Sequence, residues 1–225
     1  MRIIHILIAT VLLLSGLNTA FAGVIVGGTR VIYPEGKNEI SLTIKNPDKN
    51  TDYLIQSWLD NTDENYNGKI PFVVTPPLFR LNRESSNVLR IADAGARLPT
   101  DRESLYWLSV KAIAGTPKQN QGNQLQVVVR TKIKFIYRPS ALDAAGAADA
   151  YKALTFTRQG SELVATNPTP YYVSFYSLKV GGKNIESPGM VAPFGELRVK
   201  SPATGAIEWQ SINDYGGYSA VAASR

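Results

Sequence analysis

The sequence contains no Cys and a single His, His5, which lies within the first 22 residues. The rest of the chain therefore has neither residue type. This absence excludes a disulfide framework and thiol catalysis there, together with Cys or His metal ligation and every Ser-His-Asp type of nucleophile activation. Long apolar runs are also missing, because no segment after residue 22 approaches the roughly 20 residues needed to span a bilayer. Most familiar hydrolase chemistry is excluded before any motif is considered.

The first 22 residues are typical of a secretory signal peptide. Met1 and Arg2 form a basic start, an apolar run follows from Ile6 to Leu14, and residues 20–22 read Ala-Phe-Ala, a small-x-small cleavage pattern. We expect cleavage before Gly23, an exported product and no membrane insertion after cleavage. A membrane anchor is the alternative, although the run is short for one.

The charge of the chain is mildly basic. Lys and Arg number 24 against 18 Asp and Glu, giving a formal net charge of +6. The cations are scattered and never form a run of four, so no nucleic-acid partner is expected. A length of 225 residues allows one large domain or two of about 100 residues each. Such cores can hold without disulfides.

Strand patterns occupy most of the chain after residue 23. Residues 39–45 alternate polar and apolar side chains, which predicts a strand with one buried face. Similar runs occur at 53–59, 87–91, 104–113, 124–137, 154–156, 163–165, 171–180, 196–200 and 206–212. Short strands separated by Asn, Pro and Gly turns indicate antiparallel sandwiches.

An Ala-rich stretch from Arg138 to Lys152 interrupts the strand pattern. Pro139 should end the preceding strand, since it lacks a ladder donor. The Ala residues favour a short helix, although Gly146 weakens that prediction. The interruption divides the chain into residues 23–140 and 141–225, each near the size of an immunoglobulin-like sandwich. The predicted fold class is all-β.

The most informative segment is the long strand predicted from Leu125 to Tyr137. Apolar residues occupy its odd positions and Gln126, Arg130, Lys132 and Lys134 occupy even ones. Thirteen residues would extend roughly 40 Å, about twice the length of a usual strand. A strand of that length can extend beyond its own core and pair with the incomplete sheet of a partner. The alternative is an ordinary long central strand.

Several motifs in order along the chain resemble the periplasmic pilus chaperones of the PapD and FimC type. These motifs are Gly28–Pro34, Thr75–Phe79, Leu98–Trp107, Thr131–Pro139, Asn167–Tyr172 and Ile212–Gly216. The short stretch between Ile113 and Gln124 and the absence of Cys resemble the short-loop subfamily.

The resemblance implies two immunoglobulin-like domains in a boomerang arrangement around a cleft. It also implies a chaperone that binds pilus (fimbrial) subunits in the periplasm by donor-strand complementation and delivers them to an outer-membrane usher. No catalytic residue, metal or cofactor is expected. Three sets of residues match family roles: the donor residues Leu125, Val127 and Val129; the cations Arg30 and Lys134, which bind the subunit's C-terminal carboxylate; and the interdomain ion network of Glu103, Arg138 and Asp214.

Two other classes of protein remain open at this point. The same sandwich pattern suits a two-domain surface or adhesive protein, because a fold does not determine a function. An exported carbohydrate-active enzyme needs only paired carboxylates, for which Asp101 and Glu103 are the candidates.

Overall fold

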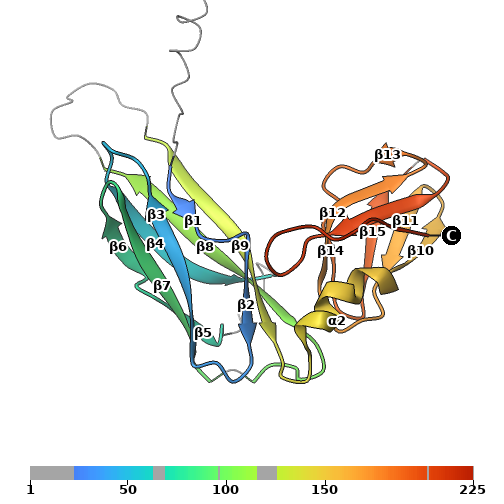
Figure 1. Ribbon diagram of the computed structural model, residues 1–225, viewed down its shortest axis with the longest axis horizontal. Coiled ribbons are helices and arrows are strands. Elements are labelled where there is room, and N and C mark those ends of the chain that lie inside the picture. Colours follow the sequence, from blue (N-terminus) through green and yellow to red (C-terminus); the bar gives the residue numbers. More distant parts are fainter. Residues whose placement is uncertain (1–22, 63–68, 96, 116–125, 202, 225) are drawn as a thin grey trace, which may run out of the picture.

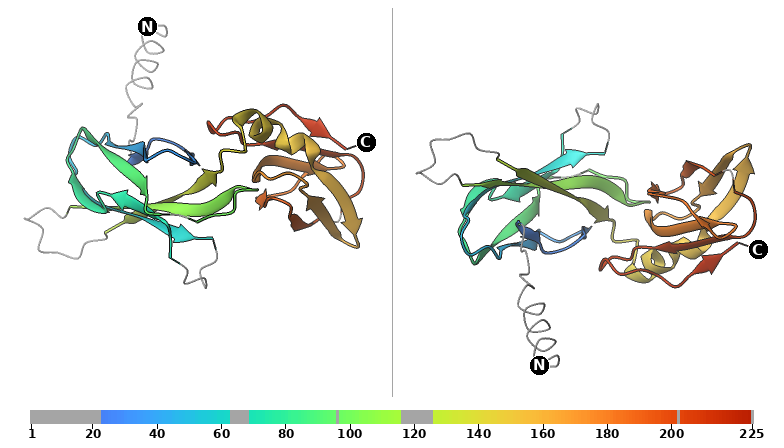
Figure 2. Two further views of the ribbon diagram at one scale, coloured as in Figure 1. Left: turned by 90° about the horizontal axis from the view of Figure 1, so that it is seen from below. Right: turned by 90° about the horizontal axis from the view of Figure 1, so that it is seen from above.

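The computed structural model describes residues 23–62, 69–95, 97–115, 126–201 and 203–224. The predicted signal peptide, most of the short stretch after Ile113 and the donor candidate Leu125 lie outside these residues. Figure 1 shows two sandwich domains set at an angle and joined at their base, where strand β9 leads into helix α2. The additional views in Figure 2 show the same two separate bodies. This arrangement confirms the all-β, two-domain fold class.

The N-terminal domain is a sandwich of two sheets. One sheet has the order β1-β3-β7-β5 and the other β2-β9-β8-β4-β6. Only β2 and β9 pair in parallel; the other pairs in these two sheets are antiparallel. The strands are β1 (Ile25–Val26), β2 (Arg30–Pro34), β3 (Glu39–Asn46), β4 (Tyr53–Asn61), β5 (Phe72–Thr75), β6 (Leu78–Leu81), β7 (Ser85–Asp93), β8 (Ser104–Ala114) and β9 (Val128–Arg138).

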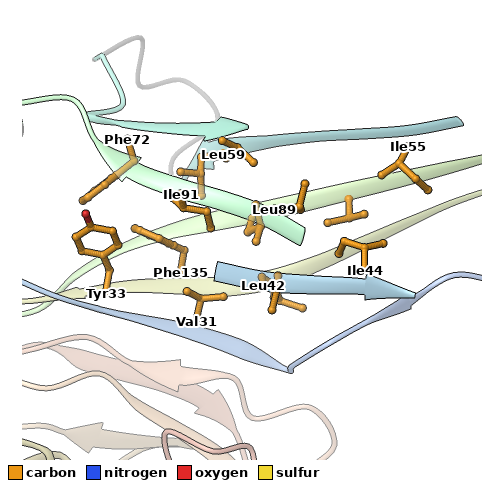
Figure 3. Packing of buried hydrophobic residues seen from close by; sticks show 14 of the residues in the cluster. Val31, Tyr33, Leu42, Ile44, Ile55, Leu59, Phe72, Leu89, Ile91 and Phe135 are labelled. Carbon is orange, nitrogen blue, oxygen red and sulfur yellow. The ribbon is translucent and has the colours of Figure 1, made fainter. Parts of the chain in front are cut away.

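Aliphatic and aromatic side chains from both sheets fill the first core. Ile44 and Leu89 are fully buried, as the alternation in β3 and β7 requires. Tyr33, Phe72 and Phe135 pack as an aromatic group at one end, with ring centroids 4.8–5.7 Å apart. Figure 3 shows these rings beside the aliphatic residues that fill the space between the sheets.

The C-terminal domain begins with helix α2 (Ala144–Asp149) and the 3₁₀ helix η1 (Ala150–Ala153). Its sheets have the orders β10-β11-β15 and β13-β12-β16-β17, with β14 paired to β12. The strands are β10 (Thr155–Gln159), β11 (Glu162–Thr166), β12 (Val173–Val180), β13 (Lys183–Asn184), β14 (Met190–Val191), β15 (Glu196–Lys200), β16 (Ile207–Ser211) and β17 (Ala222–Ala223). Trp209 packs against Phe156 in this core and donates to the Tyr151 carbonyl at 2.9 Å.

Gly146 lies within the short helix because of its close contact with Tyr171, which its helix propensity does not indicate. A Cβ at this position would collide with the Tyr171 ring, so the helix approaches the sheet closely only because the residue is Gly. The Asp143 carboxylate caps the helix by accepting from the Gly146 N–H at 2.7 Å. Close packing and capping thus support a helix that propensity alone disfavours.

Strand β9 is shorter at its start than the sequence pattern predicts. It begins at Val128 and ends at Arg138, so Val127 precedes the regular strand. Its first three residues are exposed, whereas Ile133, Phe135 and Tyr137 are buried in the core. The apolar face therefore continues beyond its own core, and only its C-terminal half is covered.

Candidate functional site

Two cations lie next to each other where β9 meets β2. Arg30 is the first residue of β2, and its register partner on β9 is Lys134. The two residues are more than one hundred positions apart in sequence, and parallel pairing of the strands brings them together. Both side chains point toward the junction with the C-terminal domain, because each donates a hydrogen bond to that domain. Lys134 Nζ donates to Ser174 Oγ at 2.7 Å, and Arg30 Nη1 donates to the Ile212 carbonyl at 2.9 Å.

The cation pair has no anionic partner in the part of the chain that the structure describes. Neither side chain forms an ion pair there, although carboxylates neutralise several other Arg residues. The Nε atom of Arg30 is buried and has no hydrogen-bond partner among the residues that the structure describes. A buried donor without an acceptor costs about 1–3 kcal/mol, so an incoming anion would be stabilised here.

Burial lowers the pKa of both groups. Burial, followed by the nearby charge of Arg30, lowers the pKa of Lys134 to about 8. Burial also lowers the pKa of Arg30, against the opposing effects of Asp214 and Glu103. A bound carboxylate would reverse part of this effect, since an opposite charge favours the protonated amine.

The predicted ion-network residues form a continuous set of contacts between the domains. Arg138 Nε donates to Glu103 Oε1 at 2.7 Å, and its two Nη atoms donate to Asp214 at 2.7 and 3.0 Å. The second oxygen of Glu103 accepts from the Tyr172 N–H at 2.7 Å. Arg138 and Glu103 belong to the N-terminal domain, whereas Tyr172 and Asp214 belong to the C-terminal domain. The buried guanidinium thus links the two sandwiches.

Burial strongly influences the titration of this network. Burial raises the pKa of the Glu103 carboxyl, although the Tyr172 N–H and Arg138 favour its ionised form. Burial opposes the charge of Arg138, but its bonds to Asp214 and Glu103 outweigh this effect and raise its pKa. The guanidinium therefore remains charged and depends on both carboxylates.

The open edge of β9 comes immediately before Lys134 along the strand. Strand β8 pairs with β9 along residues 128–137, but β2 pairs only with residues 134–138. The other edge of β9 is therefore unpaired from Val128 to Ile133 within the described residues. Val127 and Val129 are 63% and 51% exposed at the start of this edge. The predicted donor residue Leu125 falls outside the described residues.

A polar cluster beneath this edge was not recognised from the sequence. Arg130 Nη2 contacts Asp60 Oδ2 at 2.5 Å and Ser109 Oγ at 2.8 Å, and its guanidinium lies 4.9 Å from the Trp58 ring centroid. Trp58 Nε1 in turn donates to Asp60 Oδ1 at 2.7 Å. These residues anchor β9 to its neighbours just after the exposed valines. The sequence did offer one signal for this cluster: Trp58 and Asp60 are two positions apart in β4, so both side chains lie on the same face of the strand.

The candidate carboxylates for glycoside hydrolysis are already paired with Arg residues. Asp101 is exposed and contacts Arg102 at 2.7 Å, whereas Glu103 is buried against Arg138. Among the described residues, no group of three or more potential ligands could hold a metal ion. Within those same ranges, no helix is long and apolar enough to cross a membrane.

Two immunoglobulin-like sandwiches, an exposed strand edge and a partly buried cation pair define a two-domain protein suited to binding another polypeptide. Two family models match almost all of the described chain: the pili and flagellar-assembly chaperone PapD N-terminal domain over residues 23–143, and the pili assembly chaperone PapD C-terminal domain over residues 149–223. The chain belongs to this PapD family of pilus-assembly chaperones.

Individual relatives agree with the family assignment. The chain is 43% identical over 202 residues to the chaperone protein FocC of Escherichia coli, covering 88% of this chain and 87% of the relative. It is 44% identical over 201 residues to FimC of Escherichia coli K12, covering 88% and 82%. These relatives favour an assembly chaperone over the adhesive protein considered above.

Solved structures show the same architecture. The structure of the Salmonella enterica SafA pilin with the SafB chaperone contains a chain with a TM-score of 0.82 and 35% identity, covering 92% of this chain and 98% of that one. The Escherichia coli chaperone DraB gives a TM-score of 0.80 at 35% identity, with coverages of 90% and 96%.

We predict that Glu103→Ala destabilises the protein strongly. The substitution leaves the buried Arg138 guanidinium with one carboxylate fewer, and breaking such a pair costs roughly 3–5 kcal/mol. The matched control is Glu39→Ala, which removes the carboxylate partner of the exposed Arg90 and should cost less than about 1 kcal/mol. Urea unfolding of both variants measures the difference. Equal losses would show that the network contributes no more than a surface ion pair.

We also predict a pH dependence that originates at Lys134. Its pKa is about 8 in the folded protein and 10.5 in an exposed chain, so between these values the unfolded chain binds more protons. The free energy of unfolding of the wild type should therefore rise, relative to Lys134→Met, as the pH increases from about 7 to about 10. Urea unfolding across this range tests the prediction, and a pH-independent difference would contradict it.

Proposed function

We propose that this protein is a periplasmic, non-catalytic chaperone that binds pilus (fimbrial) subunits by donor-strand complementation and delivers them to an outer-membrane usher. The observation that carries the proposal is the partly buried pair Arg30 and Lys134, which forms no ion pair among the described residues and lies where the edge of β9 becomes unpaired. Family membership and the SafA–SafB relative support it. No cofactor, metal or nucleic acid takes part.

The cation pair binds the C-terminal carboxylate of the subunit in this proposal. A chain terminus has a full negative charge and two acceptor oxygens, which suit one guanidinium and one ammonium. Each charge-assisted hydrogen bond is worth about 1.5–3 kcal/mol. The unpaired Arg30 Nε supplies a further donor. The negative charge of the terminus would also oppose the burial and the repulsion from Arg30 that together lower the pKa of Lys134.

Anchoring the terminus determines the register of the two chains along β9. Val127 precedes Lys134 by seven residues, a distance of roughly 23 Å along an extended strand. A subunit strand held at the cations would then lie along the unpaired edge of β9 and use its backbone hydrogen-bonding groups. A slip of one residue would present the opposite face, including Arg130, to the subunit.

The donor residues Leu125, Val127 and Val129 fill the gap in the subunit core. Each buried apolar side chain contributes around 1.5–3 kcal/mol before the cost of ordering. Val127 and Val129 are exposed in the free protein, so their burial by a subunit is a net gain for both chains. The valines fit shallow pockets in the partner.

We predict that Arg30→Ala and Lys134→Ala each abolish subunit capture while the protein remains folded. Losing one charge-assisted contact should reduce affinity at least about tenfold. The measurement co-expresses the tagged chaperone with a pilus subunit from the same organism and quantifies the subunit recovered from periplasmic extract. Arg90→Ala, on the other sheet, is the matched control and should recover as much as the wild type. Normal recovery with both cation variants would refute the carboxylate role.

We predict that Val127→Asp weakens capture without reducing stability. Its side chain is 63% exposed, so a carboxylate is tolerated in the free protein but not inside an apolar subunit core. The same co-purification assay should recover less subunit, and thermal unfolding should match the wild type. The control is Val88→Asp, an exposed valine on β7 in the other sheet. If Val127→Asp instead melts the N-terminal domain, Val127 belongs to the core and the donor assignment is wrong.

A further inference from the structure

The C-terminal domain exposes an unusual group of tyrosines. Among the described residues, the exposed aromatic side chains are those of Tyr176, Phe194, Tyr215 and Tyr218. Three of these four belong to β12 and the loop that follows β16. Tyr215 is 96% exposed, Tyr218 61% and Tyr176 54%. We call Tyr176, Tyr215 and Tyr218 the tyrosine surface.

Two of the three rings hold each other in a fixed arrangement. Tyr176 and Tyr218 stack with centroids 4.5 Å apart and ring planes 14° from parallel. Tyr218 forms an antiparallel bridge with Ile212, and β12 pairs with β16 through an irregularity between Phe175 and Ser177. Both residues are nevertheless more than half exposed.

The loop from residue 212 to 218 is held in place although Tyr215 is exposed. Asn213 Oδ1 accepts from the N–H groups of Tyr215 and Gly217, each at 3.0 Å. Asp214 is bound by Arg138, and a Cβ at Gly216 would lie 2.6 Å from Thr29 Oγ1. The loop thus contacts the N-terminal domain closely, so Tyr215 is displayed by an ordered segment. Ordered aromatic residues lose little entropy on binding.

The segments that display the tyrosines also contact the cation pair. Ser174, which accepts from Lys134, precedes Tyr176 by two residues on β12. The Ile212 carbonyl accepts from Arg30, and Ile212 is the bridge partner of Tyr218. Each cation therefore contacts a segment that also displays a tyrosine. Figure 1 shows the loop, in dark red, reaching from the C-terminal domain toward β2 and β9.

We propose that the tyrosine surface forms a second wall of the subunit site and packs against the uncharged polypeptide surface next to the bound C-terminal carboxylate. This inference rests on the proposed function. Arg30 and Lys134 donate hydrogen bonds to the two segments that carry the tyrosines, so a carboxylate held there would lie beside these segments and at the start of the open edge of β9. Tyrosine suits this position because its large ring buries apolar area while its hydroxyl can hydrogen-bond to backbone groups.

A competition experiment tests this proposal. Wild-type and variant chaperones with different affinity tags are co-expressed with a pilus subunit from the same organism, and the subunit recovered on each tag is compared. The variant with Tyr215→Ala and Tyr218→Ala should hold about one tenth of the wild-type share. Leu78→Ala, which truncates an exposed side chain on the far edge strand β6, should compete equally. An equal share for the tyrosine variant overturns the proposal.

Chemical footprinting of the wild-type protein provides a second test, which does not require that a variant folds. Tetranitromethane should nitrate Tyr215 readily in the free chaperone and about tenfold more slowly in the subunit complex, as measured by peptide mass spectrometry. Unchanged nitration overturns the proposal. So does normal subunit capture by the tyrosine variant with loss of usher binding, which would assign the surface to the usher. If the wild type captures no subunit, the proposed function itself fails.

Discussion

The buried guanidinium of Arg138 is the interaction on which the rest of the site depends. It lies at the end of β9 and binds Glu103 beside it and Asp214 from the other domain. Asp214 belongs to the loop that also brings the Ile212 carbonyl to Arg30. A charge in this position cannot be left unpaired without a large loss of stability, so the two domains are restricted to orientations that keep both carboxylates in contact.

The cation pair differs from Arg138, which is bound by two carboxylates, because it lacks an ion pair among the described residues. Arg30 and Lys134 are partly buried beside each other and are bound only by neutral oxygens among the described residues. The low pKa of Lys134 reflects the unfavourable free energy of that arrangement. The charged pair therefore lowers the stability of the free protein, and a bound ligand carboxylate would offset that loss. Because the Arg138 network holds the loop in place, the cations cannot relax by separating from the C-terminal domain.

The sequence predicted the strands, but it predicted few of the contacts between residues that lie far apart in the chain. Alternation in residues 39–45 predicted β3, and the polar and apolar faces of residues 125–137 predicted the strand that the structure begins at Val128, because both follow from the period of a strand. The partners Ser174 and Ile212 could not be predicted, since neutral oxygens have no distinctive spacing. The proximity of Arg30 and Lys134 was expected only from the family resemblance, because parallel pairing over such a separation leaves no local signal.

An exposed apolar strand edge can pair with unrelated chains, and the neighbouring charges disfavour such pairing. Arg130 and Lys132 follow the exposed valines, and their cationic groups lie over Trp58 and Trp107 at 4.9 and 5.1 Å. Cations along an edge strand disfavour pairing with an arbitrary second strand. A strand that ends in a carboxylate at Arg30 and Lys134 has a compensating attraction that other strands lack. Under the proposed function, the arrangement that exposes the edge of β9 would therefore also make this edge selective for a chain terminus.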